Sequence, residues 1–211
     1  MTNTLAKACV VIGGGGHAKV LVDILTSMSD VQVLGYTDVK QRNLTIPYLG
    51  NDTCLFAYLI NEIFLVNGIG SVSFPRQRKE IFEMFKKKGY RFYSITHSRA
   101  IIASDVKLAE GVQVMAGAII NSSSSIGENV IINTAASIDH DCQIGAHTHV
   151  APGATLSGRV TIGENCHVGT GATIIQNITI GHGTVIGAGS VVIKDIPPEV
   201  VAVGNPAKYE R

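Results

Sequence analysis

The sequence has no tryptophan, and aromatic residues make up only 6% of its 211 residues. Charged residues account for 16%, compared with roughly 25% in an average soluble domain. The formal net charge is only +1, so there is no basic stripe to neutralise a phosphate backbone and no polybasic tail for an anionic membrane surface. We therefore expect no nucleic acid among its partners.

Long hydrophobic runs are also missing. The most apolar stretch, "LFAYLINEIFLV", is interrupted by Asn61 and Glu62, well short of the ~20 residues needed to span a bilayer. The N-terminal segment has four strong apolar residues in a row before its glycines, too few for a secretory signal. No CxxC pair or metal-ligand spacing occurs among the cysteines, which are Cys9, Cys54, Cys142 and Cys166. These features predict a cytoplasmic protein that does not insert into a membrane and in which Cys142 and Cys166 are buried, reduced thiols.

What the sequence does contain is 23 glycines and a six-residue repeat. From Ile102 to Val192, sixteen consecutive positions spaced six apart are all aliphatic. The position four residues later is never charged and never larger than isoleucine, and the position three later is Gly, Asn or Asp in twelve of sixteen cases. Because these three residue types tolerate positive φ at least cost, a tight corner is predicted every six residues.

This period is incompatible with one face of an α-helix, and the glycines would each cost a helix about 1 kcal/mol. It fits a solenoid of short parallel strands, in which the aliphatic and the small residue of each hexad point inward. The pattern resembles the hexapeptide repeat of the left-handed parallel β-helix, and its handedness is implied by that resemblance alone. Sixteen hexads would form about five coils, with equivalent residues about 4.8 Å apart in adjacent coils.

Residues 1–97 show a different pattern, of alternating strand and helix. "KACVVIGGGGHAKVLVDIL" indicates a buried strand, a glycine turn and a helix with Val20, Ile24 and Leu25 facing inward. Two further strands are expected in "VQVLGYTD" and "EIFLVNGIGS", followed by a helix in "FPRQRKEIFEMFKKKG" with Pro75 near its first turn. This order predicts a small Rossmann-like parallel sheet with a site at its carboxyl edge, followed by the all-β domain at 98–211.

A possible phosphate-binding turn lies between the first strand and helix. Gly13, Gly15 and Ala18 satisfy G-x-G-x-x-A, and Asp38 follows about twenty residues later. In the dinucleotide fingerprint, backbone N–H groups at the helix start hold phosphate and the acid holds a ribose hydroxyl. The domain is too short for two mononucleotide halves, so one nucleotide, such as that of an activated sugar, fits better than NAD. The alternative is that the glycines form only a tight turn and His17 is an ordinary surface residue.

The order of these parts resembles the bacterial sugar O-acyltransferase family of the sialic acid O-acetyltransferase type. The markers are "VIGGGGHAKV", "NGIGSVSFPRQR", "IINTAASIDHDCQIGAHTHVAPGATLSG" and "VAVGNPAK", and the match covers essentially the whole chain. The family includes N-acetyltransferases of nucleotide-linked 4-amino-4,6-dideoxy sugars, as in bacillosamine and perosamine pathways. The resemblance implies an acetyl-CoA-dependent N-acetyltransferase for surface glycan synthesis, with a sialic acid O-acetyltransferase as the alternative.

The resemblance also implies roles for individual residues. His140 would be the general base and Asp141, where many relatives have Glu, would orient it. Asn133 and Asp139 would lie near the sugar and His149 near the acetyl group. The full substrate-binding set implied is Gly15, Gly16, His17, Asp38, Gly70, Arg76, Asn133 and Asp139. The cofactor-binding set implied is His149, Gly158, Thr170, Ala188 and Pro206. Acetyl-CoA would lie in a groove between neighbouring prisms of a homotrimer.

The residues themselves agree with acyl transfer. A thioester is already activated, so the enzyme must mainly align the nucleophile, remove its proton and stabilise the oxyanion. A histidine suits the proton transfer. His140 follows the inward Ile138 by two residues, so it is predicted to point outward at a corner. An outward histidine on a flat prism can meet another subunit, which favours a site shared between subunits.

The repeat is also compatible with two other functions. The γ-class carbonic anhydrases hold zinc on this type of helix with three histidines, and His149 and His167 here are eighteen residues apart. The spacing of two coils that such a site needs is not met, because the residues thirty-six beyond His140 and His149 are Gln176 and Val185. No metal is therefore expected. The second function is a non-catalytic scaffold that senses a nucleotide, against which the His140–Asp141 pair argues.

Overall fold

The computed structural model describes residues 6–71 and 76–209. Their contacts group the chain into two compact units. The first comprises the chain up to Gly70 together with Glu80–Ile95, and the second comprises Ser71–Lys79 together with the chain from Thr96 onward.

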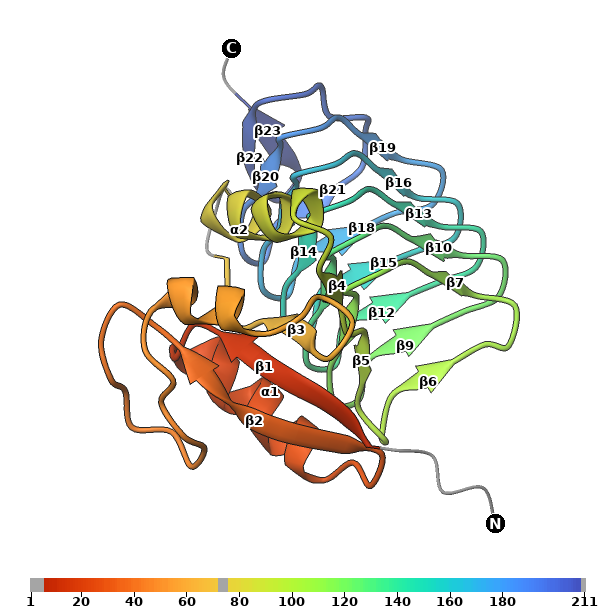
Figure 1. The fold of residues 1–211 in the computed structure, drawn as a ribbon. Coiled ribbons are helices and arrows are strands. Elements are labelled where there is room, and N and C mark those ends of the chain that lie inside the picture. The colour runs from red at the N-terminus through yellow and green to blue at the C-terminus, as the bar shows by residue number, and fades with distance from the viewer. Residues whose placement is uncertain (1–5, 72–75, 210–211) are drawn as a thin grey trace. The chain divides into compact units, whose positions relative to one another are not determined.

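The first unit contains a four-stranded sheet in the order β2-β1-β3-β4, with all neighbours parallel (Figure 1). Its strands are β1 (Lys7–Ile12), β2 (Val31–Thr37), β3 (Phe64–Asn67) and β4 (Arg91–Phe92). Its helical elements are α1 (Gly16–Thr26), the 3₁₀ turn η1 (Asp52–Ala57) and most of α2 (Arg76–Lys87). The predicted parallel sheet is confirmed. Pro75, expected near the start of α2, lies outside the described residues.

The helix α1 packs through a stripe of residues at helical spacing. Its buried side chains are Ala18, Leu21, Val22, Ile24 and Leu25. The prediction that Val20 faces inward was wrong, because its side chain is 46% exposed. Once the helix begins at Gly16, residues 18, 21, 22 and 25 form the i, i+3, i+4, i+7 stripe, and residue 20 falls outside it.

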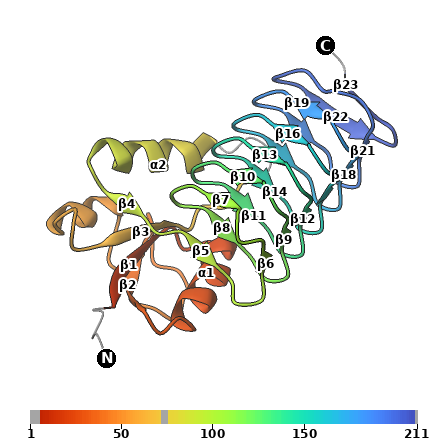
Figure 2. The ribbon, with the colours of Figure 1, turned by 90° about the vertical axis from the view of Figure 1, so that its right-hand side faces the viewer.

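The second unit is a parallel β-solenoid whose coils each have three short strands (Figures 1 and 2). We name its three faces by their first strands. The β6 face contains β6 (Ile101–Ile102), β9 (Ile119–Ile120), β12 (Ser137–Ile138), β15 (Thr155–Leu156), β18 (Thr173–Ile174) and β21 (Val191–Val192). The β7 face contains β7 (Lys107–Leu108), β10 (Ser125–Ile126), β13 (Gln143–Ile144), β16 (Thr161–Ile162) and β19 (Thr179–Ile180).

The β8 face contains β8 (Gln113–Val114), β11 (Ile131–Ile132), β14 (His149–Val150), β17 (His167–Val168) and β20 (Val185–Ile186). It continues into β22 (Val201–Gly204) and β23 (Ala207–Tyr209), and β5 (Ile95–Thr96) stands where the chain enters the solenoid. Residues eighteen apart pair in register, as Ser137 does with Thr155. The predicted period of three hexads per coil is therefore confirmed.

The solenoid core consists of the aliphatic and small residues that the repeat predicted. Ile138 and Cys142 are both fully buried in it, as are their counterparts in the other central coils. The corner residue has positive φ in fourteen of the sixteen hexads, the exceptions being Asp105 and Asp195. Each six-residue repeat thus has two side chains that point into the core and one corner residue with a left-handed backbone. Its other side chains lie at the surface.

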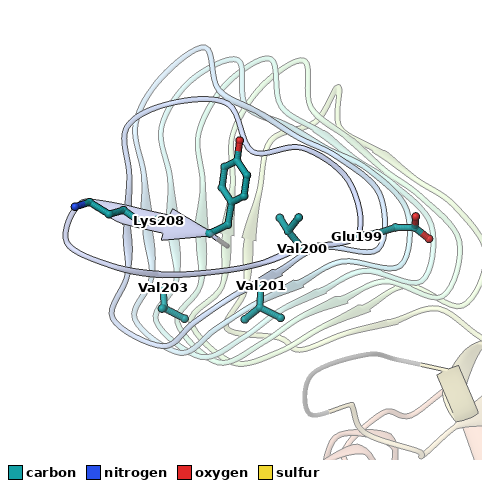
Figure 3. Close-up of a pocket in the computed structure, with 6 residues that line it drawn as sticks. Glu199, Val200, Val201, Val203 and Lys208 are labelled. Atoms are coloured by element: carbon teal, nitrogen blue, oxygen red, sulfur yellow. The ribbon is translucent and has the colours of Figure 1, made fainter. Parts of the chain in front are cut away.

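The chain closes the β8 face with an antiparallel hairpin of β22 and β23. The turn between them contains a cis peptide bond before Pro206. A hollow of about 480 Å³ lies at this end of the solenoid and is lined by Glu199, Val200, Val201, Val203, Lys208 and Tyr209. Figure 3 shows Val201 and Val203 projecting to one side of the chain and Val200 to the other, with Lys208 and Glu199 at opposite ends of the group. Within the described ranges, no helix is long and apolar enough to span a bilayer.

The buried ladder predicts a difference between adjacent residues of one strand. Ile162 is 1% exposed and points into the core, whereas Thr161 precedes it on the outer surface. Ile162→Ala should lower the free energy of unfolding by about 3 kcal/mol, because it removes buried methylenes and leaves a cavity. Thr161→Ala is the matched control and should stay within about 0.5 kcal/mol of wild type. Urea unfolding followed by circular dichroism measures both, and equal effects would contradict the inward assignment.

Candidate active site

His140 and Asp141 form a hydrogen-bonded pair at a corner of the solenoid. They lie between β12 and β13, where the β6 face turns into the β7 face, and we call this the β6/β7 corner. His140 Nδ1 is 2.7 Å from Asp141 Oδ2, and the two side chains are 52% and 51% exposed. Because a carboxylate accepts, it favours the neutral tautomer with the proton on Nδ1, in which Nε2 is the acceptor. An ion pair this exposed adds little stability, so its effect is to orient the imidazole.

The backbone of Asp141 makes this short pairing possible. Asp141 has φ of 59° and so occupies the left-handed corner position of its hexad. Its N–H donates to Ser122 O at 3.0 Å in the coil below. The carboxylate is therefore carried by a residue whose backbone conformation the solenoid requires.

The imidazole of His140 lies over Gly158 of the next coil. A Cβ at residue 158 would lie 2.6 Å from both Cε1 and Nε2 of His140. The ring therefore uses the space that the glycine leaves, and a side chain at residue 158 would have to displace it. A hollow of about 440 Å³ opens here, lined by Asp139, His140, Ser157, Gly158, Arg159, Gln176 and Asn177.

Asp139 faces the turn that carries His140. Its Oδ1 accepts from His140 N at 2.8 Å and from Asn121 Nδ2 at 3.0 Å. The His140 N–H, followed by the Asn121 amide, lowers the pKa of Asp139 below its ordinary value, so the carboxyl is ionised at neutral pH.

Three other predicted residues lie at a different corner. Asn133, Thr170 and Ala188 each follow a strand of the β8 face and precede one of the β6 face, at what we call the β8/β6 corner. Thus Asn133 and Asp139, both predicted near the sugar, lie at opposite edges of the β6 face. The outward side chains between these edges are Ile101, Ile119, Ser137, Thr155, Thr173 and Val191, none of them charged.

His149 is held by a network that determines its tautomer. Asn133 Oδ1 accepts from Thr134 N at 2.8 Å, so Asn133 Nδ2 faces His149 Nε2 at 2.9 Å and donates to it. The proton of His149 is therefore on Nδ1, which lies 3.0 Å from Ser71 O and 2.9 Å from Ser71 Oγ. Buried to 7% exposure, His149 packs edge-on against His167 with ring centroids 5.0 Å apart. The predicted stacking on adjacent coils is confirmed.

His167 completes this histidine pair. Burial lowers the pKa of His167, so it is neutral at physiological pH. Among the residues that the structure describes, no group of three or more His, Cys, Asp or Glu is arranged to hold a metal ion.

The glycine turn of the first unit brings its predicted residues together. Gly13 has φ of +90°, which requires glycine, and its N–H donates to Thr37 O at 2.7 Å. A Cβ at Gly14 would clash with Arg42 and Tyr36 at 2.7 and 2.8 Å. At Gly15 and Gly16, by contrast, a Cβ would meet nothing within 4 Å among the described residues. Neither conformation nor packing therefore demands glycine there, and the open space suits a ligand that approaches the backbone closely.

Asp38 lies beside this turn, as the fingerprint predicts. Its Oδ2 accepts from Gly14 N at 3.0 Å and pairs with Arg42 Nε at 3.2 Å. Partial burial would raise the pKa of Asp38, but the hydrogen bonds from Gly14 and Arg42 outweigh it, and the pKa is lowered. The helix α1 begins at Gly16 with His17 in its first turn, so N–H groups and an ionised acid face one region.

The remaining predicted residues are more scattered. Gly70 packs against His17, because a Cβ there would lie 3.2 Å from His17 Cβ. Arg76 is the first residue of α2 and is exposed. Pro206 lies in the β22–β23 turn, next to the hollow at the end of the solenoid.

Comparison with known proteins identifies the family. Residues 9–85 match the PglD N-terminal domain, and residues 123–158 and 159–194 each match the bacterial transferase hexapeptide (six repeats). The structure of PerB from Caulobacter crescentus, in complex with CoA and GDP-perosamine, is 38% identical with a TM-score of 0.90 and covers 97% of each chain. The chain belongs to this family of sugar N-acetyltransferases.

Other members and relatives agree with this assignment. The acetyltransferase domain of PglB from Neisseria gonorrhoeae is 33% identical with a TM-score of 0.91, covering 97% of this chain and all of that chain. WeeI from Acinetobacter baumannii, at 24% identity and a TM-score of 0.85, shares the fold. No curated protein sequence matches the chain. Membership confirms the predicted sugar acyltransferase resemblance, the left-handed β-helix and an acyltransferase activity.

Several residues around the candidate site were not found from the sequence. Arg42 beside Asp38 and Ser71 beside His149 lie in irregular segments without a repeat, so no spacing indicated them. Asn121 could have been found, because it precedes Asp139 by eighteen residues and must therefore lie directly below it.

Proposed function

We propose that this chain transfers the acetyl group of acetyl-CoA to the amino group of a nucleotide-linked 4-amino-4,6-dideoxy sugar for surface glycan synthesis. The observation that carries the proposal is the His140–Asp141 pair, whose Nδ1–Oδ2 distance is 2.7 Å. The pair lies at an open corner of the solenoid, in a chain that belongs to the sugar N-acetyltransferase family. The PerB structure, which contains CoA and GDP-perosamine, supports both the cosubstrate and the substrate class.

The chemistry of the proposed reaction needs one base. His140 Nε2 accepts a proton from the sugar amine as its nitrogen attacks the thioester carbonyl, and Asp141 stabilises the imidazolium that forms. The new C–N bond replaces the C–S bond, and the proton passes from His140 to the departing thiolate of CoA. General base catalysis of this kind contributes typically ~10²–10⁴-fold.

The nucleotide would bind at the glycine turn of the first unit. The open space over Gly15 and Gly16, at the start of α1, supports phosphate binding through backbone N–H groups. Asp38 is ionised and lies beside them, which supports contact with a sugar hydroxyl or the base.

The complete site would be shared within a homotrimer. His140 and Gly158 lie at the β6/β7 corner, whereas Asn133, Thr170 and Ala188 lie at the β8/β6 corner. If three prisms pack with their uncharged β6 faces toward a common axis, the β8/β6 corner of one meets the β6/β7 corner of the next. Acetyl-CoA would then contact both corners at once.

The base assignment predicts a large loss of turnover in His140→Ala. Its kcat should fall about 10²-fold or more, while the Kd for acetyl-CoA changes by less than about threefold, because the base acts mainly in the transition state. His182→Ala, at another exposed corner, is the control. Mass spectrometry over UDP-, dTDP- and GDP-linked 4-amino sugars, with sialic acid as the O-acetylation alternative, measures the product. Wild-type turnover in His140→Ala would remove the assignment.

The phosphate assignment predicts that Gly15→Ala folds normally but binds substrate weakly. Gly15 has φ of −78°, which alanine adopts without strain, so the melting temperature should not change. The Kd for the nucleotide sugar should rise about tenfold or more, since a methyl group would occupy the space needed by phosphate. Gly14→Ala is the contrast, because its clash with Arg42 and Tyr36 should lower the melting temperature. Calorimetric titration measures binding, and an unchanged Kd in Gly15→Ala would contradict the site.

A shared site predicts complementation between two inactive variants. When His140→Ala and Asn133→Ala chains are co-expressed, about a quarter of the sites in randomly mixed closed trimers should combine an intact His140 with an intact Asn133. Light scattering should give a mass of three chains of 22.3 kDa each. If each site were built within one chain, no mixed site would be complete and activity would not return.

A further inference from the structure

The turn that carries His140 is braced from the coil below it. Asp139 Oδ1 accepts His140 N–H at 2.8 Å and Asn121 Nδ2 at 3.0 Å. A single carboxylate oxygen therefore joins the backbone of His140 to a side chain one coil away.

The solenoid register makes this link possible. Ser137 pairs with Ile119 and Ile138 with Ile120, so the residues that follow these strands, Asp139 and Asn121, stack at the strand spacing of ~4.8 Å. At that spacing a carboxamide can reach a carboxylate directly. Asn121 N also donates to Ile138 O at 2.9 Å, which fixes the backbone on which the amide is carried.

Ser124 fixes the other side of the same turn. Its Oγ donates to Asp139 O at 3.0 Å and accepts from Cys142 N at 3.1 Å. The two ends of the segment between Asp139 and Cys142 are thus bonded to the coil below, and the brace at Asn121 acts on the residue nearest His140.

The imidazole depends on this turn for its position. His140 is half exposed, and the contacts described for its ring are Asp141, which belongs to the same turn, and Gly158. A small rotation of the turn would therefore move Nε2 together with its orienting acid. Displacements of about 1 Å in a reacting group can cost 10²-fold in rate.

We propose that Asn121 is a positioning residue for His140, acting through Asp139 and the His140 N–H. The inference rests on the proposed function for its catalytic consequence, but the brace itself is a property of the free protein. In this proposal Asp139 holds the turn that carries His140, and this role does not require Asp139 to contact the sugar.

The test compares a disruptive and a conservative substitution. Asn121→Asp replaces the donating amide by a carboxylate that repels Asp139, with almost no change in shape. Asn121→Gln keeps an amide that can donate to Asp139 Oδ1 and leaves Asp139 itself unchanged. Asn165→Asp, at a half-buried corner away from His140, controls for the general cost of changing an asparagine to an aspartate, and its positive φ of 58° is one that aspartate tolerates.

The expected kinetic result is a loss of kcat in Asn121→Asp that Asn121→Gln does not share. Asn121→Asp should lower kcat by about 10- to 100-fold with the KM for acetyl-CoA within about twofold of wild type, because the base is misplaced and the cosubstrate contacts remain. Asn121→Gln and Asn165→Asp should stay within about threefold of wild type. Unchanged kcat in Asn121→Asp, or an equal loss in Asn121→Gln, overturns the proposal.

Amide hydrogen exchange at His140 tests the brace without any activity. Exchange should be about tenfold faster or more in Asn121→Asp than in wild type or in Asn121→Gln, since a loosened turn opens more often. If wild type acetylates none of the amino sugars, the proposed function fails while the exchange rates still decide the brace. Equal exchange in all variants overturns the positioning role, even where kcat has changed.

Discussion

The structure depends on the requirement that two of every six side chains fill the interior of a coil. A strand of two residues cannot be stable alone, so each is held only by hydrogen bonds to the coils above and below and by the packing of residues such as Ile138 and Cys142 beneath it. A charged or bulky side chain at either inward position would disturb three coils at once. The remaining positions of each hexad are released from this constraint.

The proposed site uses the positions that are released. His140 and Asp141 occupy a corner that the core does not touch, yet Asp141 also supplies the left-handed turn that the central coils have there. Gly158 keeps space for the imidazole in the next coil, and Asn121 and Ser124 hold the turn from the previous one. Three successive coils thus determine the position of one side chain, although equivalent positions in adjacent coils are eighteen residues apart along the chain.

The sequence predicted the solenoid well because its signal is repeated sixteen times, so that single deviations such as Arg159 or His147 at corners do not obscure it. The glycine turn and Asp38 were also predictable, since their spacing follows from strand and helix geometry. Val20 was predicted on the wrong side of α1 because one short helix has few turns from which the position of its buried stripe can be determined. The contacts of Arg42 and Ser71 could not be predicted, because irregular segments have no period that relates position in the sequence to position in space.

The hairpin of β22 and β23 has a consequence for the molecule as a whole. A stack of parallel strands would otherwise end in a row of unsatisfied backbone groups, to which a strand of another molecule could add. On the β8 face, β22 occupies that row, and β23 pairs with β22 in the opposite direction as the last strand. The remaining edge is therefore a strand of three residues that includes the exposed Lys208, and a short, charged edge disfavours further pairing. The same segment that borders the terminal hollow thus opposes end-to-end growth of the solenoid into fibres.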